Sequence, residues 1–266
     1  MKILFIGDIF GKPGRDTVKK LLPSIREKYM PDLILANAEN LNHGNGFNFS
    51  GISEMRVVGI DFFTSGNHVW DNPDGVSHLN EPDFPVLRPA NFPDPSTPGR
   101  GHQVIEDKNG NKILLINLLG RVFMGKNFEC PFRTADKILA EHKNENLSAV
   151  FVDFHAETTS EKQAFGFYLD GRASAVAGTH THVATLDARI LNSGTAYISD
   201  VGMTGSFDSV IGAKKELIIK AFLTQLAAKI EPETEGRMVF SAVLVEVDGK
   251  TKKGLNIGHI QEFINV

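Results

Sequence analysis

The sequence predicts an α/β fold in which two mixed sheets pack together and helices cover their outer faces. In the first part of the chain, short apolar runs rich in β-branched residues alternate with amphipathic stretches, an order typical of parallel strands buried on both faces. In the second part hairpin signals become frequent, which two packed sheets explain better than one doubly wound sheet. A chain of 266 residues can bury a sizeable core, and because we find no linker we expect residues 1–266 to form one domain.

The first elements follow from hydrophobic periodicity. Apolar runs predict strands at residues 2–9, 32–38 and 61–65, and helices are expected between them at residues 13–29 and 49–59. The first helix is predicted from five large side chains at helical spacing on one face, namely Val18, Leu21, Leu22, Ile25 and Tyr29. This β-α-β-α-β order predicts parallel strands.

Residues 72–101 interrupt the alternation. They hold seven of the twelve prolines, so we expect a loop with one short strand at most, either a binding loop or a passive excursion. The next two strands, 102–107 and 112–119, flank Asn109-Gly110, a hairpin signal. Later strands are expected at 149–154, 173–178, 188–191 and 195–198, and later helices at 134–144, 158–169 and 214–228. A hairpin of residues 238–247 and 255–264 around Asp248-Gly249 closes the chain.

Composition excludes several classes of protein. The single cysteine, Cys130, excludes a disulfide framework and suggests a reducing compartment. The net charge of −4 and the scattered basic residues leave no extended track for nucleic acid. Apolar runs fall well short of the roughly 18 residues of a membrane span, so we expect a cytoplasmic protein with no membrane partner.

Polar side chains collect where the predicted strands end. Ligands of α/β folds bind outside the carboxyl ends of strands, so these side chains predict one site built from many loops. They are Asp8, Glu39, Asn40, Asn67, His68, His155, His180 and His182. Each alone has a plainer explanation, such as a helix cap, a turn or a hydrogen-bonded core histidine. Unrelated helix caps and turns rarely give five such clusters at successive strand ends, so together the clusters favour one functional site.

The residue types indicate metal ions. In the His180-Thr181-His182 segment we expect both imidazoles on one side, because alternate residues of a strand share a face. Oxygen and imidazole donors suit manganese, iron or zinc. About seven donors exceed the needs of one open site, so we expect two ions, roughly 3.5–4 Å apart. A bridging carboxylate holds two cations at that separation, and Glu39 is the central candidate.

In these motifs the chain resembles the calcineurin-like metallophosphoesterases. The superfamily carries, in order, Asp-x-His, a bridging Asp, Gly-Asn-His, a separate His and Gly-His-x-His. The matching segments here begin at Asp8, Ala38, Gly66, His155 and Thr179. Phe10 replaces a histidine ligand and Glu39 replaces the bridging aspartate, and both departures resemble the bacterial YmdB-like branch. That resemblance extends over nearly the whole chain.

The resemblance implies a four-layer α-β-β-α sandwich and a ligand set for each ion. One ion would take Asp8, Glu39, Asn40 and His182, with Asn40 in place of the missing histidine. The other would take Glu39, Asn67, His155 and His180. An amide is a weaker donor than imidazole, so we prefer iron, then manganese, with zinc third.

The resemblance also implies an activity. The YmdB-like branch is linked to hydrolysis of cyclic nucleotides, notably 2′,3′-cyclic and also 3′,5′-cyclic ones, by attack of a metal-bridging hydroxide. His68 would face the substrate as the catalytic acid that protonates the departing alkoxide, rather than bind metal.

Two alternatives stay open. One is a phosphomonoesterase or 5′-nucleotidase acting through the same site. The other is a regulatory protein whose metal site acts through RNA-processing partners. For a small substrate, residues 72–101 could close over one nucleotide with Phe84 or Phe92 stacked on the base, although both side chains are equally explained as core anchors. The sequence is compatible with a homo-oligomer and does not specify one.

Overall fold

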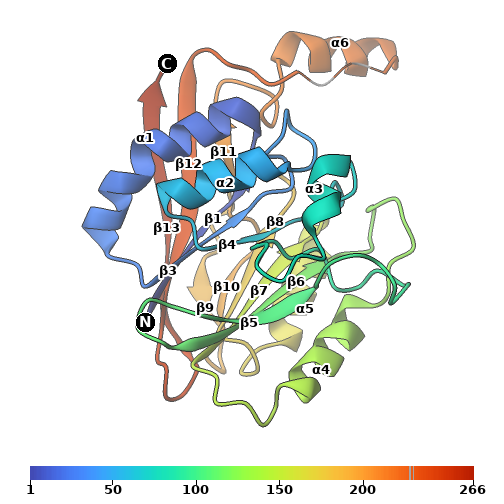
Figure 1. Cartoon of the computed structure of the whole chain (residues 1–266). Coiled ribbons are helices and arrows are strands. Elements are labelled where there is room, and N and C mark those ends of the chain that lie inside the picture. Colours follow the sequence, from blue (N-terminus) through green and yellow to red (C-terminus); the bar gives the residue numbers. More distant parts are fainter. Residues whose placement is uncertain (228, 230) are drawn as a thin grey trace.

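The structure is a computed structural model that describes every residue except 228 and 230. Two mixed β-sheets pack face to face, and helices cover the outer face of each, which gives four layers (Figure 1). The α/β class, the two packed sheets and the four-layer sandwich expected from the sequence are confirmed.

The first sheet has seven strands, with β13 added beside β12 in the order β2-β11-β12-β1-β3-β4. Strands β1, β3 and β4 are parallel, so their carboxyl ends lie at one edge of the sheet. Strand β12 runs antiparallel to β1, pairing Lys2 with Glu246. The strands are β1 (Lys2–Ile6), β2 (Asp8–Ile9), β3 (Leu33–Asn37), β4 (Phe62–Thr64), β11 (Met203–Ser206), β12 (Arg237–Val247) and β13 (Gly254–Asn265).

The second sheet has six strands in the order β5-β6-β7-β8-β10-β9. Its central strands β6, β7, β8 and β10 are parallel, and the predicted β5–β6 hairpin forms one edge. The strands are β5 (His102–Glu106), β6 (Lys112–Leu119), β7 (Ala149–His155), β8 (Ala175–Thr179), β9 (Arg189–Ile190) and β10 (Ala196–Ile198).

The helices lie outside the two sheets. In Figure 1, α1 and α2 cover the seven-stranded sheet, and α4 and α5 lie beside the six-stranded one. Helix α6 extends away from both (Figure 1). The helices are α1 (Gly11–Tyr29), α2 (Phe49–Val58), α3 (Pro73–His78), α4 (Pro131–Glu141), α5 (Thr159–Tyr168) and α6 (Lys215–Thr224).

Strand β1 shows why its sequence is apolar throughout. Ile3 and Phe5 point into the core between the sheets, whereas Leu4 and Ile6 point into the core beneath α1 and α2. Successive side chains of a strand alternate between faces, so a strand covered on both faces needs apolar residues at every position.

Three predictions of secondary structure need correction. Residues 72–101 contain helix α3 rather than loop alone: the Asn72 side chain accepts a hydrogen bond from the Asp74 amide, and Pro73 occupies the first helical position. The proline count obscured this ordinary helix start.

The predicted strand 2–9 is interrupted at Gly7, where a Cβ would lie 1.9 Å from the Gly202 carbonyl oxygen. Strand β11 had not been predicted.

The predicted helix 214–228 extends into a residue outside those that the structure describes. Its described part, α6, ends at Thr224. Across the described residues, no helix combines the length and the apolar character needed to cross a membrane.

Candidate metal centre

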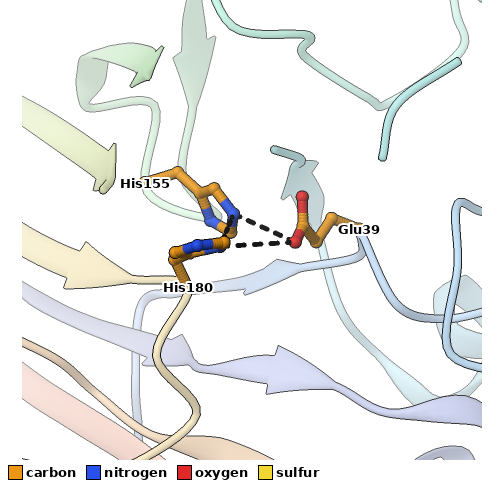
Figure 2. Close-up of side chains that lie close together, drawn as sticks. All are labelled: Glu39, His155 and His180. Atoms are coloured by element: carbon orange, nitrogen blue, oxygen red, sulfur yellow. Dashed lines mark hydrogen bonds and ion pairs between the residues drawn. The ribbon is translucent and has the colours of Figure 1, made fainter. Parts of the chain in front are cut away.

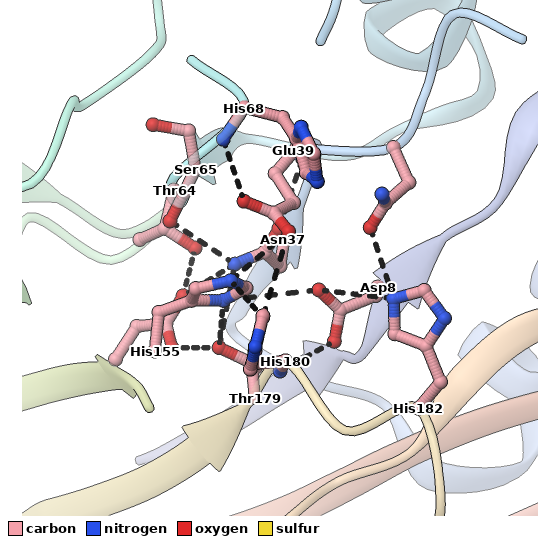
Figure 3. A network of polar contacts seen from close by, with 12 residues as sticks. Asp8, Asn37, Glu39, Thr64, Ser65, His68, His155, Thr179, His180 and His182 are labelled. Carbon is pink, nitrogen blue, oxygen red and sulfur yellow. Dashed lines mark hydrogen bonds and ion pairs between the residues drawn. The ribbon is translucent and has the colours of Figure 1, made fainter. Parts of the chain in front are cut away.

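Six of the residues predicted as a site lie together where the carboxyl ends of parallel strands from both sheets converge, namely Asp8, Glu39, His68, His155, His180 and His182 (Figure 3). Asn40 contacts His182, and Asn67 directly precedes His68 in the chain. Glu39 follows β3 and His68 follows β4 in the first sheet, whereas His155 ends β7 and His180 follows β8 in the second. Parallel strands bring their carboxyl ends to one edge, so residues far apart in the chain meet there.

Glu39, His155 and His180 form the tightest group (Figure 2). The Nε2 atom of His155 lies 3.0 Å from Glu39 Oε1 and 3.0 Å from His180 Nδ1, and His180 Nδ1 lies 4.0 Å from Glu39 Oε1. One carboxylate oxygen and two imidazole nitrogens therefore point at a common centre. That donor set suits a divalent transition metal.

Asp8, Asn40 and His182 form a second group beside the first. His182 Nε2 lies 3.0 Å from Asn40 Oδ1 and 3.9 Å from Asp8 Oδ1. The Asn40 amide nitrogen donates to the Gly44 carbonyl at 2.7 Å, which turns the amide oxygen toward His182. Phe10, which stands where the superfamily has a histidine ligand, is buried and lies edge-on against the His182 ring. Its side chain makes an apolar contact there instead of offering a ligand atom.

Two buried oxygens of the site lack hydrogen-bond partners among the described residues, Asp8 Oδ1 and Asn67 Oδ1. An unsatisfied buried carboxylate oxygen costs more than about 1–3 kcal/mol, so such atoms call for an explanation such as a bound cation. Both residues were predicted as ligands from the sequence. The side chains present thus fit a metal centre, and their individual roles as ligands remain predictions.

Electrostatics also favour bound cations. Burial, and then the charge of Glu39, raises the pKa of Asp8 well above its usual range. Burial raises the pKa of Asp153 to about 7, although Asn37, Thr64 and Thr179 donate hydrogen bonds to it. A cation among these carboxylates would stabilise their ionised forms.

The imidazoles are in the form that metals bind. Burial lowers the pKa of His155 to about 4 against the opposing influence of Glu39, and burial also lowers the pKa of His182. Both rings are therefore neutral near pH 7, with a nitrogen lone pair available. His155 Nδ1 contacts Thr179 Oγ1 at 2.8 Å, which orients its other nitrogen toward Glu39.

The loop that carries His180 and His182 has an unusual backbone. The two residues have φ angles of 101° and 64°, in the region that side chains with a Cβ rarely adopt. Asp200 fixes this loop by accepting hydrogen bonds from the Thr181 amide at 3.1 Å and the Thr181 hydroxyl at 2.8 Å. Lys162 Nζ lies 2.6 Å from the same carboxylate oxygen, deep in the protein.

Because the loop is not extended, the two imidazoles do not share a strand face as the sequence reasoning assumed. His180 joins the Glu39–His155 group and His182 joins the Asp8–Asn40 group. The strained turn at these residues, rather than the alternation of side chains along a strand, brings the two imidazoles to one site.

Sequence reasoning missed the buried polar residues behind the site, chiefly Asp153, Lys162 and Asp200. A signal existed for two of them. Asp153 interrupts an otherwise apolar buried strand, and Asp200 comes shortly after the apolar strand β10. Charged residues are almost never fully buried unless they are paired.

His68 lies at the rim rather than inside. Its amide nitrogen is 3.2 Å from Glu39 Oε2, its Nδ1 is 2.7 Å from Asp71 Oδ2, and its side chain is 34% exposed. A side chain so placed can reach solvent and a bound molecule while it stays next to the carboxylate.

For Phe84 and Phe92 the sequence left stacking on a base and anchoring in the core as alternatives. Phe84 is only 4% exposed and packs among Phe47, Phe49 and His78, so it is a core anchor and cannot stack on a base. Phe92 lies edge-on between Trp70 and Phe128. The structure therefore favours anchoring for both aromatic side chains.

Comparison with solved structures defines the class of protein. A protein from Thermus thermophilus is 40% identical with a TM-score of 0.90, covering 99% of both chains. A phosphatase from Mycoplasma pneumoniae is 36% identical with a TM-score of 0.91, covering 100% of this chain and 94% of the other. A 5′-nucleotidase precursor from Thermus thermophilus, 12% identical with a TM-score of 0.56, covers 100% of this chain and 54% of its own and shares the fold alone. The fold is that of the metallophosphoesterases.

The chain belongs to the YmdB-like protein family, whose model matches residues 4–260. A relative from Bacillus subtilis (strain 168) is 46% identical over 261 residues, which is 98% of this chain and 96% of the relative, and is named 2′,3′-cyclic-nucleotide 2′-phosphodiesterase. The family resemblance inferred from the motifs is confirmed.

Proposed function

We propose that this protein is a two-metal phosphodiesterase that hydrolyses small cyclic nucleotides, foremost 2′,3′-cyclic ones. The observation that carries the proposal is the unsatisfied buried Asp8 Oδ1, which lies 3.9 Å from His155 Nδ1 and so beside the Glu39–His155–His180 group. Asn67 Oδ1, one residue before His68, is also buried without a partner among the described residues. The name of the 46% identical relative supports the substrate class.

In this proposal Asp8, Glu39, Asn40 and His182 hold one ion. Glu39, Asn67, His155 and His180 hold the other, so the Glu39 carboxylate serves both. Iron is the preferred metal, followed by manganese and then zinc. When bound, two such ions would neutralise phosphoryl oxygens and lower the pKa of a water at the site, so that hydroxide is available to attack phosphorus near neutral pH.

His68 serves as the acid. Its Nδ1 contacts the Asp71 carboxylate at 2.7 Å, which fixes the ring and leaves Nε2 to face the substrate. In 2′,3′-cyclic hydrolysis the oxygen of a water that has lost a proton to solvent bonds to phosphorus, the ring P–O bond to the departing ribose oxygen breaks, and His68 gives its proton to that oxygen. The ring then takes a proton back from solvent, to which it is open.

The substrate is small in this proposal because the chain carries a net charge of −4 and its 28 lysine and arginine residues form no run longer than two for a polynucleotide backbone. The test is kcat/KM for 2′,3′-cyclic AMP and for a short RNA, each at low and at physiological salt. We expect the cyclic nucleotide to be preferred with a shallow salt dependence. Preference for the RNA with a steep salt slope would overturn the small-substrate assignment.

A phosphomonoesterase is the second candidate, favoured by the 36% identical phosphatase from Mycoplasma pneumoniae. The same panel with 5′-AMP and 3′,5′-cyclic AMP added separates the two. Turnover of 5′-AMP above that of every diester would replace the phosphodiesterase assignment by this one.

A further inference from the structure

A second group of metal-binding side chains lies apart from the candidate centre. His102 begins β5, Glu141 ends α4, and His142 follows it. One ligand atom from each lies within 4.8 Å of the others. His102 Nε2 is 3.7 Å from Glu141 Oε2, and the two imidazole rings meet edge-on with centroids 5.1 Å apart.

This group lies on the other face of the six-stranded sheet from the candidate centre. Val104 of β5 packs with Ala135 and Ile138 of α4, so His102, two residues earlier, points to that same outer face. His155 shares a strand face with Phe151, which packs between the two sheets. The two groups therefore cannot share an ion.

The imidazoles are arranged as ligands usually are. His142 Nδ1 lies 2.7 Å from Glu145 Oε1, a carboxylate contact that fixes the ring and leaves Nε2 free to bind. Burial, and then the neighbouring His142, lowers the pKa of His102, which keeps its ring neutral at pH 7. Neutral imidazole is the form that coordinates metal.

The surrounding charges are compatible with a cation. Arg88 and Lys137 are the positive groups near His102, and Arg88 donates to the carbonyls of Pro98, Pro89 and Thr97. The carboxylates of Glu141 and Glu145 balance them. The group also lies at the carboxyl end of α4, where the helix dipole favours positive charge.

We propose that His102, Glu141 and His142 bind one zinc ion, independently of the proposed catalytic function. Two imidazoles and one carboxylate are a zinc ligand set, with water in the fourth position. The ion would tie the edge strand β5 to the end of α4, two elements that are otherwise joined by side-chain packing.

The test is equilibrium dialysis of the whole protein against Zn²⁺ followed by elemental analysis. We expect wild type to bind one more equivalent than His142→Ala, and Glu141→Gln, which preserves shape, to weaken the same equivalent at least tenfold. His78→Ala is the matched control, because His78 Nδ1 also lies 2.7 Å from a carboxylate three residues on, that of Glu81. It should bind as wild type does.

Two further readouts make the result decisive. Zn²⁺ should raise the melting temperature of wild type and His78→Ala by more than that of His142→Ala. Hydrolysis of 2′,3′-cyclic AMP by protein loaded with Mn²⁺ should be equal in wild type and His142→Ala. Equal zinc stoichiometry and equal thermal response in all variants would overturn the proposal, whether or not the protein hydrolyses cyclic nucleotides.

Discussion

His155 Nε2 lies 3.0 Å from Glu39 Oε1, and the two residues belong to different sheets. Glu39 follows β3 of the seven-stranded sheet, and His155 ends β7 of the six-stranded one. The contact therefore exists only when the sheets are docked. Any ion held between these two side chains links the two halves of the sandwich.

Replacing Glu39 should affect both proposed ions, whereas replacing Asn40 should affect one. Glu39→Ala removes the carboxylate that would serve both proposed ions, and two cations about 4 Å apart repel each other strongly without an anion between them. We expect elemental analysis to find both ions depleted in Glu39→Ala and about one equivalent retained in Asn40→Ala. Equal, mild losses in the two variants would contradict a shared Glu39.

His68→Ala should keep both ions and lose roughly 10²–10⁴ in turnover of 2′,3′-cyclic AMP, the range for general acid help. The reason is its place at the rim, beside Asp71 and next to Glu39. A substrate with a better leaving group should show a smaller defect. Loss of a metal ion from His68→Ala would identify the ring as a ligand instead.

Gly66→Ala should deplete metal, because the added Cβ would lie 1.9 Å from Glu39 Oε2 and 2.4 Å from His155 Nε2. Both side chains would have to move. Gly258→Ala is the control, since a Cβ there meets no described heavy atom within 4 Å. The measurement is metal content and circular dichroism of both variants. A Gly66→Ala protein with its full metal content would show that these side chains can shift without loss of the site.

Lys162→Met should destabilise the protein by about 3–5 kcal/mol, because it leaves the buried Asp200 carboxylate without its cation. Denaturant unfolding measures this. Asp200→Asn added to Lys162→Met should recover part of the loss, since the uncompensated charge is gone.

Each of the two changes made alone should also weaken metal binding, because Asp200 holds Thr181 between the two histidines. Unchanged metal binding would limit the ion pair to a role in stability.

The metal-free protein should lose stability as pH falls from about 6.5 towards 4. His155 has its pKa lowered to about 4 by burial, whereas the unfolded chain protonates it near 6.5, so the unfolded state takes up the proton first. The full effect is about 3 kcal/mol and saturates below pH 4. Thermal melts of EDTA-treated wild type and His155→Gln between pH 7 and 4.5 measure it. An equal fall in both proteins would assign the acid sensitivity to other groups.

Much of the fold and the site's composition could be predicted from the sequence because strand-end polar residues stand out against apolar strands. Asp8 follows β1 and His155 ends β7. Both positions could be predicted because an apolar run identifies each strand and the polar residue marks the point where the run stops. Long-range geometry could not be predicted in this way. Asp200 holds the turn at Thr181, nineteen residues away in the chain, and no local pattern encodes that contact.

Strand β12 pairs with β13 along one edge, while β1 and β11 share the other. Residues 2–6 therefore find their partners at residues 242–246, almost a whole chain length later. During synthesis the first strand, which leads to Asp8, has no neighbour on that side until the last hairpin has left the ribosome. Closing so long a loop is slow, so the centre should assemble late, after most of the polypeptide is already made.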